Sequence, residues 1–137
     1  MYLLRKEIKM KYLKDDGGRS AYYQKDSHNG DCVIRACAIA TGNDYYETFK
    51  ELTEISLEVG DLANGQPVYE EFLERHGFIK NKPPKKNGKK ISIREWSAPS
   101  GRIVALTQRH LIAIVDNVQR DTWLDERCVN SFFYKAS

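Results

Sequence analysis

The most prominent pattern of hydrophobic and polar positions is a run of small apolar residues enclosed by two turn signals. Residues 33–41 place apolar side chains around most of a helical circumference, and Arg35 is their only charge. A surface helix shows a single apolar stripe, so this broader pattern predicts a central, buried helix. A polar turn over residues 29–31 supplies N-cap chemistry before the run, and Gly42 supplies a C-terminal stop.

Three further segments show a clear periodicity. Asp44 and Glu47 resemble a capping box, and an amphipathic helix is predicted from there to residue 59. Pro67 suits the start of a shorter helix that ends at Gly77. Residues 7–12 alternate between charged and apolar, which predicts a half-exposed strand at a sheet edge.

The C-terminal third is rich in β-forming residues. Apolar runs over residues 102–107, 110–115 and 118–123 predict strands. Asp116 and Asn117 form a two-residue hairpin signal between the last two runs. We therefore expect an α+β fold in which the central helix packs on an antiparallel, largely buried sheet.

Size and composition fit one globular domain over residues 1–137, because 41% of the residues are hydrophobic and 30% are charged. Three cysteines and an opening unlike a signal peptide favour a reduced, cytoplasmic setting. No apolar run approaches the length of a membrane span, so we expect no membrane partner. The cysteines and histidines form no Cys-x-x-Cys or His-x-x-x-His pair, so we expect no metal and no other cofactor.

Positive charge is concentrated between Lys80 and Lys90, where six lysines and no acidic residue occur within eleven positions. The Pro-, Gly- and Asn-containing composition predicts a mobile surface loop. Such a loop is usually only solvated. A basic loop can also hold an acidic partner or a nucleic-acid backbone.

Cys32 stands at the start of the predicted central helix. A thiol there meets unpaired backbone N–H groups and the positive end of the helix dipole, both of which favour the thiolate. Free cysteine is also among the most buried residue types, and the neighbouring Asp31 disfavours a thiolate. Cys32 alone therefore fits a structural role, as Cys37 does, unless a partner base is present.

The C-terminal hairpin supplies such a base. If Asp116 and Asn117 are the turn residues, His110 faces Trp123 and Asp121 is the diagonal neighbour on the same face, about 7–8 Å away at Cα. A carboxylate on one imidazole nitrogen fixes the tautomer and leaves the other nitrogen to take a proton from a thiol. The pattern thus predicts a triad of Cys32, His110 and Asp121.

Structural interpretations remain open beside this triad. His110 can be a strand-start histidine that bonds a carbonyl, and Asp121 can be an ordinary exposed charge. Asp125 lies on the same face if the strand continues, and a bulge would exchange the two carboxylates, so it is the reserve third member. A helix-starting cysteine together with these residues favours the functional interpretation.

The arrangement resembles the papain-like cysteine peptidases, in which a cysteine begins the central helix, a histidine begins a later strand and an Asn-Ser-Trp motif follows. Residues 121–123, Asp-Thr-Trp, match that motif by type, with Trp123 placed to shield the histidine and carboxylate from water. The helix start is similar to the OTU deubiquitinase signature Asp-Gly-Asn-Cys followed by two apolar residues, Arg and Ala. Residues 29–36 read Asn-Gly-Asp-Cys-Val-Ile-Arg-Ala, with Asn29 where the family has Asp.

The resemblance implies a papain-like fold and a hydrolase that acts on a protein or peptide. Papain-like enzymes carry an oxyanion-hole glutamine six residues before the cysteine, where this chain has Asp26. Gln24, Asn29 or the Cys32 backbone N–H are the alternatives for that role.

These observations predict a cysteine peptidase-like hydrolase that cleaves an amide or isopeptide bond. Transfer of the acyl group to an amine, as in a transglutaminase, would use the same triad. The alternative is a papain-like scaffold, of phage or mobile-element type, that serves as a binding module. Its short chain leaves little room for a substrate cleft, and its basic loop could engage a host protein or nucleic acid.

Overall fold

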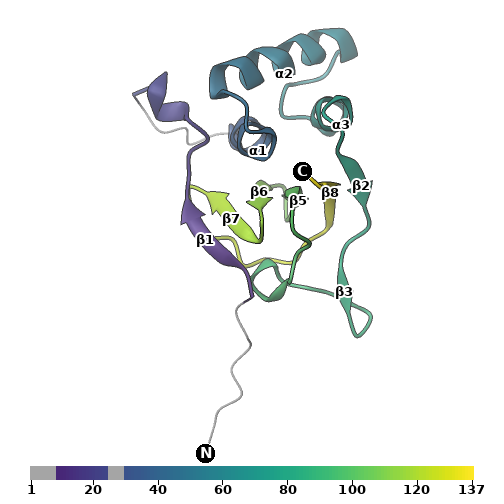
Figure 1. Ribbon diagram of the computed structural model, residues 1–137. Coiled ribbons are helices and arrows are strands. Elements are labelled where there is room, and N and C mark those ends of the chain that lie inside the picture. The colour runs from purple at the N-terminus through teal and green to yellow at the C-terminus, as the bar shows by residue number, and fades with distance from the viewer. Residues whose placement is uncertain (1–8, 25–29) are drawn as a thin grey trace, which may run out of the picture.

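A six-stranded mixed sheet lies at the centre of the computed structural model, which describes residues 9–24 and 30–137 (Figure 1). In sheet order, the strands are β1 (Lys11–Lys14), β7 (Val118–Asp121), β6 (Leu111–Val115), β5 (Arg102–Leu106), β8 (Ser131–Lys135) and β2 (Ile79–Asn81). β1 pairs with β7 in parallel, and all other pairings in this sheet are antiparallel. The C-terminal strands β5, β6 and β7 pair in antiparallel fashion, as predicted, and the parallel edge strand β1, which no hairpin joins to β7, makes the sheet mixed.

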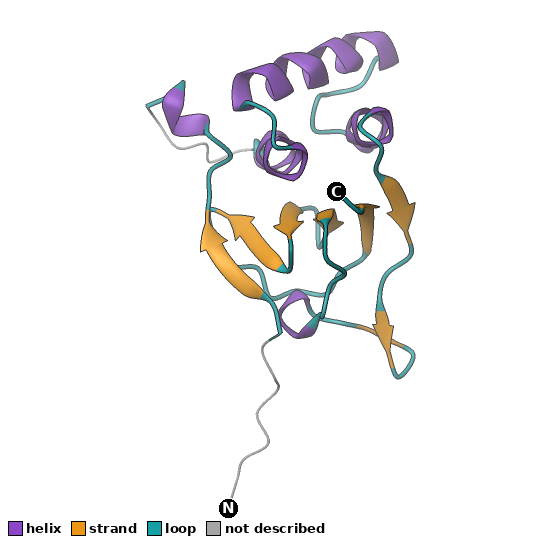
Figure 2. Ribbon diagram, viewed as in Figure 1, coloured by secondary structure: helices purple, strands orange, loops and turns teal. Residues whose placement is uncertain are grey.

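The three α-helices of the described residues cover one face of the sheet (Figure 2). They are α1 (Cys32–Thr41), α2 (Tyr45–Val59) and α3 (Gln66–Arg75). α1 lies against β6 and β5, and α2 packs on α1 and α3. The fold is therefore α+β, with the cysteine-bearing helix next to the strands that carry the other candidate residues.

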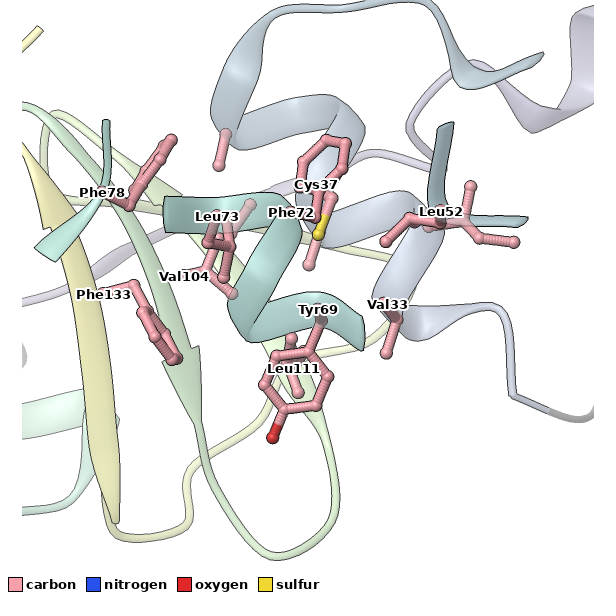
Figure 3. Packing of buried hydrophobic residues seen from close by; sticks show 14 of the residues in the cluster. Val33, Cys37, Leu52, Tyr69, Phe72, Leu73, Phe78, Val104, Leu111 and Phe133 are labelled. Atoms are coloured by element: carbon pink, nitrogen blue, oxygen red, sulfur yellow. The ribbon is translucent and has the colours of Figure 1, made fainter. Parts of the chain in front are cut away.

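The larger core fills the space between helices and sheet (Figure 3). Cys37 and Phe72 are fully buried there, together with Val104 of β5. Cys37 is thus a packing residue, as predicted. A second cluster covers the opposite face. There Met10, which precedes β1, packs with Ile112 of β6 and with Ile93 of the 3-10 helix η2 (Ile93–Glu95).

The helix boundaries follow the predicted caps. Gly42 ends α1 in a left-handed conformation with φ of 76°. The Asp44 side chain accepts a hydrogen bond from the Glu47 backbone N–H at the start of α2, and Pro67 lies in the first turn of α3. Asp31 precedes α1 but makes no side-chain capping bond, because its carboxylate is engaged elsewhere.

The β6–β7 hairpin has the predicted turn and register. Asp116 and Asn117 both have positive φ, at 48° and 64°, as a type I′ turn requires. Val115 then pairs with Val118, and Ala113 pairs with Arg120.

Four segments, two of which overlap, differ from the predictions. The edge strand covers Lys11–Lys14 rather than residues 7–12, of which residues 7 and 8 lie outside the described part. β8 and β2 were not predicted. The Lys80–Lys90 stretch is more than a loop, since it contains the end of β2 and the hairpin of β3 (Lys85–Lys86) and β4 (Lys89–Lys90). Asn87 and Gly88 make that hairpin with positive φ angles of 54° and 76°.

No helix of the described residues is both long and apolar enough to span a bilayer.

Candidate active site

Cys32 is the first residue of α1 and opens onto a cleft of about 330 Å³. Gly30, with φ of 77°, makes the left-handed turn that lets the helix begin at this point. The cleft wall is apolar along Val33, Tyr69 and Leu111 and polar along Asn64 and Gln66. The thiol is half-buried and still reachable from outside.

His110 is held by the tight turn between β5 and β6. Arg109 has φ of 56°, a conformation that costs a residue other than glycine about 1 kcal/mol. The Thr107 backbone N–H donates to the His110 carbonyl at 3.0 Å and closes the turn. The His110 side chain is only 10% exposed, so its ring nitrogens are satisfied mainly by protein groups.

Asp121 meets His110 from the end of β7. Its Oδ2 lies 2.6 Å from His110 Nε2, and the carboxylate is 3% exposed. Because Nε2 is engaged with Asp121, Nδ1 is the nitrogen left for the thiol of Cys32. The structure thus brings Cys32, His110 and Asp121 together in the predicted order.

Cys32 and His110 each influence the ionisation of the other. Burial raises the pKa of the Cys32 thiol, but hydrogen bonds from His110 and the Leu111 backbone, and the charges of His110 and Arg35, outweigh it, and the net pKa is lowered. Burial lowers the pKa of His110, but its bonds to Asp121 and Cys32 raise the net pKa to about 9. Both shifts favour a thiolate beside an imidazolium.

A buried polar network continues behind Asp121. Arg35 Nη2 lies 3.3 Å from Asp121 Oδ1, and Arg35 Nη1 bonds Asp31 Oδ1. The Tyr45 hydroxyl donates to Asp31 Oδ2 at 3.0 Å, and Arg19 Nη1 lies 3.4 Å from the same oxygen. The sequence-based prediction that Asp31 simply repels the thiolate did not take into account that its carboxylate is paired with Arg35.

Sequence reasoning missed this network, although one signal was present. Arg35 is the only charge among residues 33–41, and a charge on a buried helix needs a buried partner. Asp31 lies one helical turn before it, at the spacing at which helical side chains meet.

Asp125, the reserve third member, lies elsewhere. Its Oδ2 accepts from the Thr107 hydroxyl at 2.8 Å and from Arg127 Nη2 at 2.9 Å. Its Oδ1 accepts from the backbone N–H and Nε of Arg127. Trp123, between the two carboxylates in sequence, stacks on His110 with ring centroids 4.7 Å apart. The indole is 45% exposed, so it covers the imidazole from the solvent side.

The oxyanion candidates are placed unequally. Gln24 is exposed, makes no hydrogen bond to another described residue and does not line the cleft. Asn29 and Asp26 lie outside the described residues. The Cys32 backbone N–H belongs to the first turn of α1, where N–H groups have no intrahelical acceptor. Asn64 and Gln66, which sequence reasoning did not consider, are the side-chain amides in the cleft wall.

Within the described ranges, no group of three or more Cys, His, Asp or Glu side chains is arranged to hold a metal ion. Cys32, Cys37 and Cys128 are free thiols. Comparisons with models of protein families, with curated proteins and with solved structures give no match for this chain.

Proposed function

We propose that this protein is a cysteine peptidase-like hydrolase that cleaves an amide or isopeptide bond of a protein or peptide. The observation that carries the proposal is a buried His110 held 2.6 Å from Asp121 and hydrogen-bonded to the half-buried Cys32 thiol, beside an open cleft. A nucleophile, a base and a group that orients the base are the three parts that acyl transfer through a thiol needs.

The proposed reaction begins with attack of the Cys32 thiolate on the substrate carbonyl. His110 gives its proton to the leaving amine as the carbon–nitrogen bond breaks, and a thioester remains on Cys32. His110 then takes a proton from water, which attacks the thioester and releases the acid. An amine in place of water would give acyl transfer with the same residues. The Cys32 backbone N–H is the proposed oxyanion donor.

A papain-like architecture is part of this proposal. It is supported by a cysteine at the start of the helix nearest the sheet, by a histidine just before β6 and by a carboxylate at the end of β7, the antiparallel neighbour of β6. A cytoplasmic setting, in which the thiols remain reduced, is proposed with it.

Alkylation by iodoacetamide across a pH range tests the proposal, with labelling at each cysteine read by mass spectrometry. Cys128 is exposed and serves as the reference thiol, whereas Cys37 is buried and reports the integrity of the fold. At mildly acidic pH, Cys32 is expected to react about tenfold faster than Cys128, because only the thiolate attacks. His110→Asn should abolish that advantage while Cys37 stays protected. A Cys32 that follows the pH dependence of Cys128, or that ignores His110→Asn, would overturn the proposal.

A second candidate function is binding of an anionic partner by the basic hairpin of β3 and β4. Lys85 lies opposite Lys90, and Lys86 opposite Lys89. Like charges directly opposite one another destabilise a strand pair, and a bound acidic protein or nucleic acid would relieve that repulsion.

Heparin chromatography at rising salt separates the two candidates. Replacing the four hairpin lysines with glutamine should abolish retention if the hairpin binds polyanions, and Cys32→Ser should leave retention unchanged. Equal elution of the wild type and the glutamine variant would exclude this function.

A further inference from the structure

Arg35 connects the two ends of the buried network. It lies on α1, is 8% exposed, and contacts Asp31 on its own helix and Asp121 at the end of β7. Its Nε is buried and has no hydrogen-bond partner among the described residues. Among the described residues, the guanidinium is therefore held by the carboxylates of Asp31 and Asp121.

The two carboxylates that contact Arg35 differ in their other hydrogen-bond partners. Asp31 also accepts from Tyr45 and lies near Arg19, so it draws on three donors. Asp121 uses one oxygen for His110 and the other for Arg35 and the Thr122 backbone N–H. Buried charges are tolerated only when paired, so the charge that Arg35 presents to Asp121 depends on how strongly Asp31 engages it.

We propose that Arg35 is a positioning residue that sets the pH range in which the Cys32 thiolate and the His110 imidazolium coexist, and that Asp31 moderates its effect. The inference rests on the proposed function and names a control that acts on the same site. Arg35 competes with the imidazolium for the charge of Asp121, which eases loss of the imidazolium proton. Its positive charge also favours the thiolate. Both effects move the reactive range to lower pH.

Other charged or titratable groups face this site from every neighbouring element, and the variants leave them unchanged. They are Arg19 before α1, Tyr45 on α2, Tyr69 on α3, Cys37 on α1, Tyr12 on β1, and Arg109 before His110.

The test is the pH profile of Cys32 alkylation in variants whose predicted shifts have opposite signs. Arg35→Gln removes the cation and should move both limbs of the profile to higher pH by about one unit. Asp31→Asn leaves Arg35 more fully available to Asp121 and should move both limbs to lower pH by up to about one unit. Loss of stability alone would not produce opposite shifts. Labelling of Cys37 monitors the fold in each variant.

Two further comparisons complete the design. Arg35→Lys keeps the charge without the two-pronged contact, so its profile should lie between those of wild type and Arg35→Gln. In an Arg35→Gln background, Asp31→Asn should shift the profile less than it does in the wild type, because the part of its effect that acts through Arg35 is gone. If Arg35→Gln does not fold, Arg35→Lys and Asp31→Asn carry the test.

Failure can be assigned to one proposal or the other. A wild-type Cys32 without an abnormal, His110-dependent profile overturns the proposed function and this inference with it. The role of Arg35 alone is overturned if wild-type Cys32 shows the expected His110-dependent profile but the profiles of Arg35→Gln and Asp31→Asn coincide with it. Shifts in the same direction for both variants overturn it as well.

Discussion

Asp121 and Asp125 lie four residues apart and are equally well buried, at 3% and 0% exposure, yet they occupy different environments. Asp125 has both oxygens bound by Thr107 and Arg127, which are permanent donors. Asp121 offers one oxygen to His110, a group that gains and loses a proton. Burial and satisfied hydrogen bonds therefore do not distinguish the structural carboxylate from the candidate catalytic one. The titratable partner does.

The largest effect is expected from Asp125→Ala, and it should be on stability. Removal leaves the Thr107 hydroxyl and the Arg127 guanidinium without their acceptor, which should cost about 3 kcal/mol of unfolding free energy. Urea titration measures the loss. Labelling of buried Cys37 through transient opening should then accelerate about a hundredfold, since each 1.4 kcal/mol is a factor of ten.

The same variant should leave the pH profile of Cys32 alkylation unchanged. Asp125→Asn, which keeps the shape and several hydrogen bonds, is the matched control and should lose less stability. A shifted Cys32 profile in either variant would mean that Asp125 takes part in the candidate site.

Asp121→Asn should change the pH profile of Cys32 alkylation more than the stability of the fold. The amide keeps the size of the carboxylate but not its charge, so the imidazolium loses a main source of stabilisation, and the raised pKa of His110 should fall. The alkaline limb of Cys32 alkylation should move to lower pH by about one to two units, while unfolding free energy changes less than in Asp125→Ala. An unchanged alkaline limb would remove Asp121 from the proposed triad.

The sequence was sufficient to predict the contact between His110 and Asp121, because two turn residues determine the register of a hairpin. It ranked Asp121 ahead of Asp125, which stayed in reserve because a bulge would exchange the two carboxylates. That choice depends on where β7 ends, and the strand ends at Asp121. His110 precedes a strand and Asp121 ends one, so strand alternation does not determine where either side chain points.

Other features depended on tertiary packing. Arg35 was identifiable as an isolated charge, but its contact with Asp121 depends on how α1 crosses the sheet. β8 escaped prediction because aromatic residues occupy both of its faces, with Phe133 in one core and Phe132 and Tyr134 against the other. Without a polar face, such a strand has no alternation to detect.

Trp123 connects the two carboxylate regions, and its removal should have the smallest effect. The indole stacks on His110 and also faces Arg127, the partner of Asp125, at 5.4 Å. An aromatic face stabilises a nearby cation by about 0.5–1 kcal/mol at an exposed site. Trp123→Ala should thus move the alkaline limb of Cys32 alkylation to lower pH by about half a unit. Trp123→Phe keeps a ring over the imidazole and should shift the limb less.

The direction of the Trp123→Ala shift tests what the indole does. The indole can stabilise the imidazolium directly, and it can keep water from the bond between His110 and Asp121. If it does so, its removal weakens the contact of the imidazolium with the ring and its bond to Asp121, and each change lowers the pKa of His110. If desolvation by the indole dominates instead, exposing the imidazole would raise its pKa and move the limb to higher pH. Trp123→Ala should disturb the surroundings of Asp125 even less, because Arg127 keeps its bonds to that carboxylate. The unfolding free energy should therefore change by only about 1 kcal/mol. An upward shift would contradict the shielding role, and the Asp121→Asn result would stand independently of it.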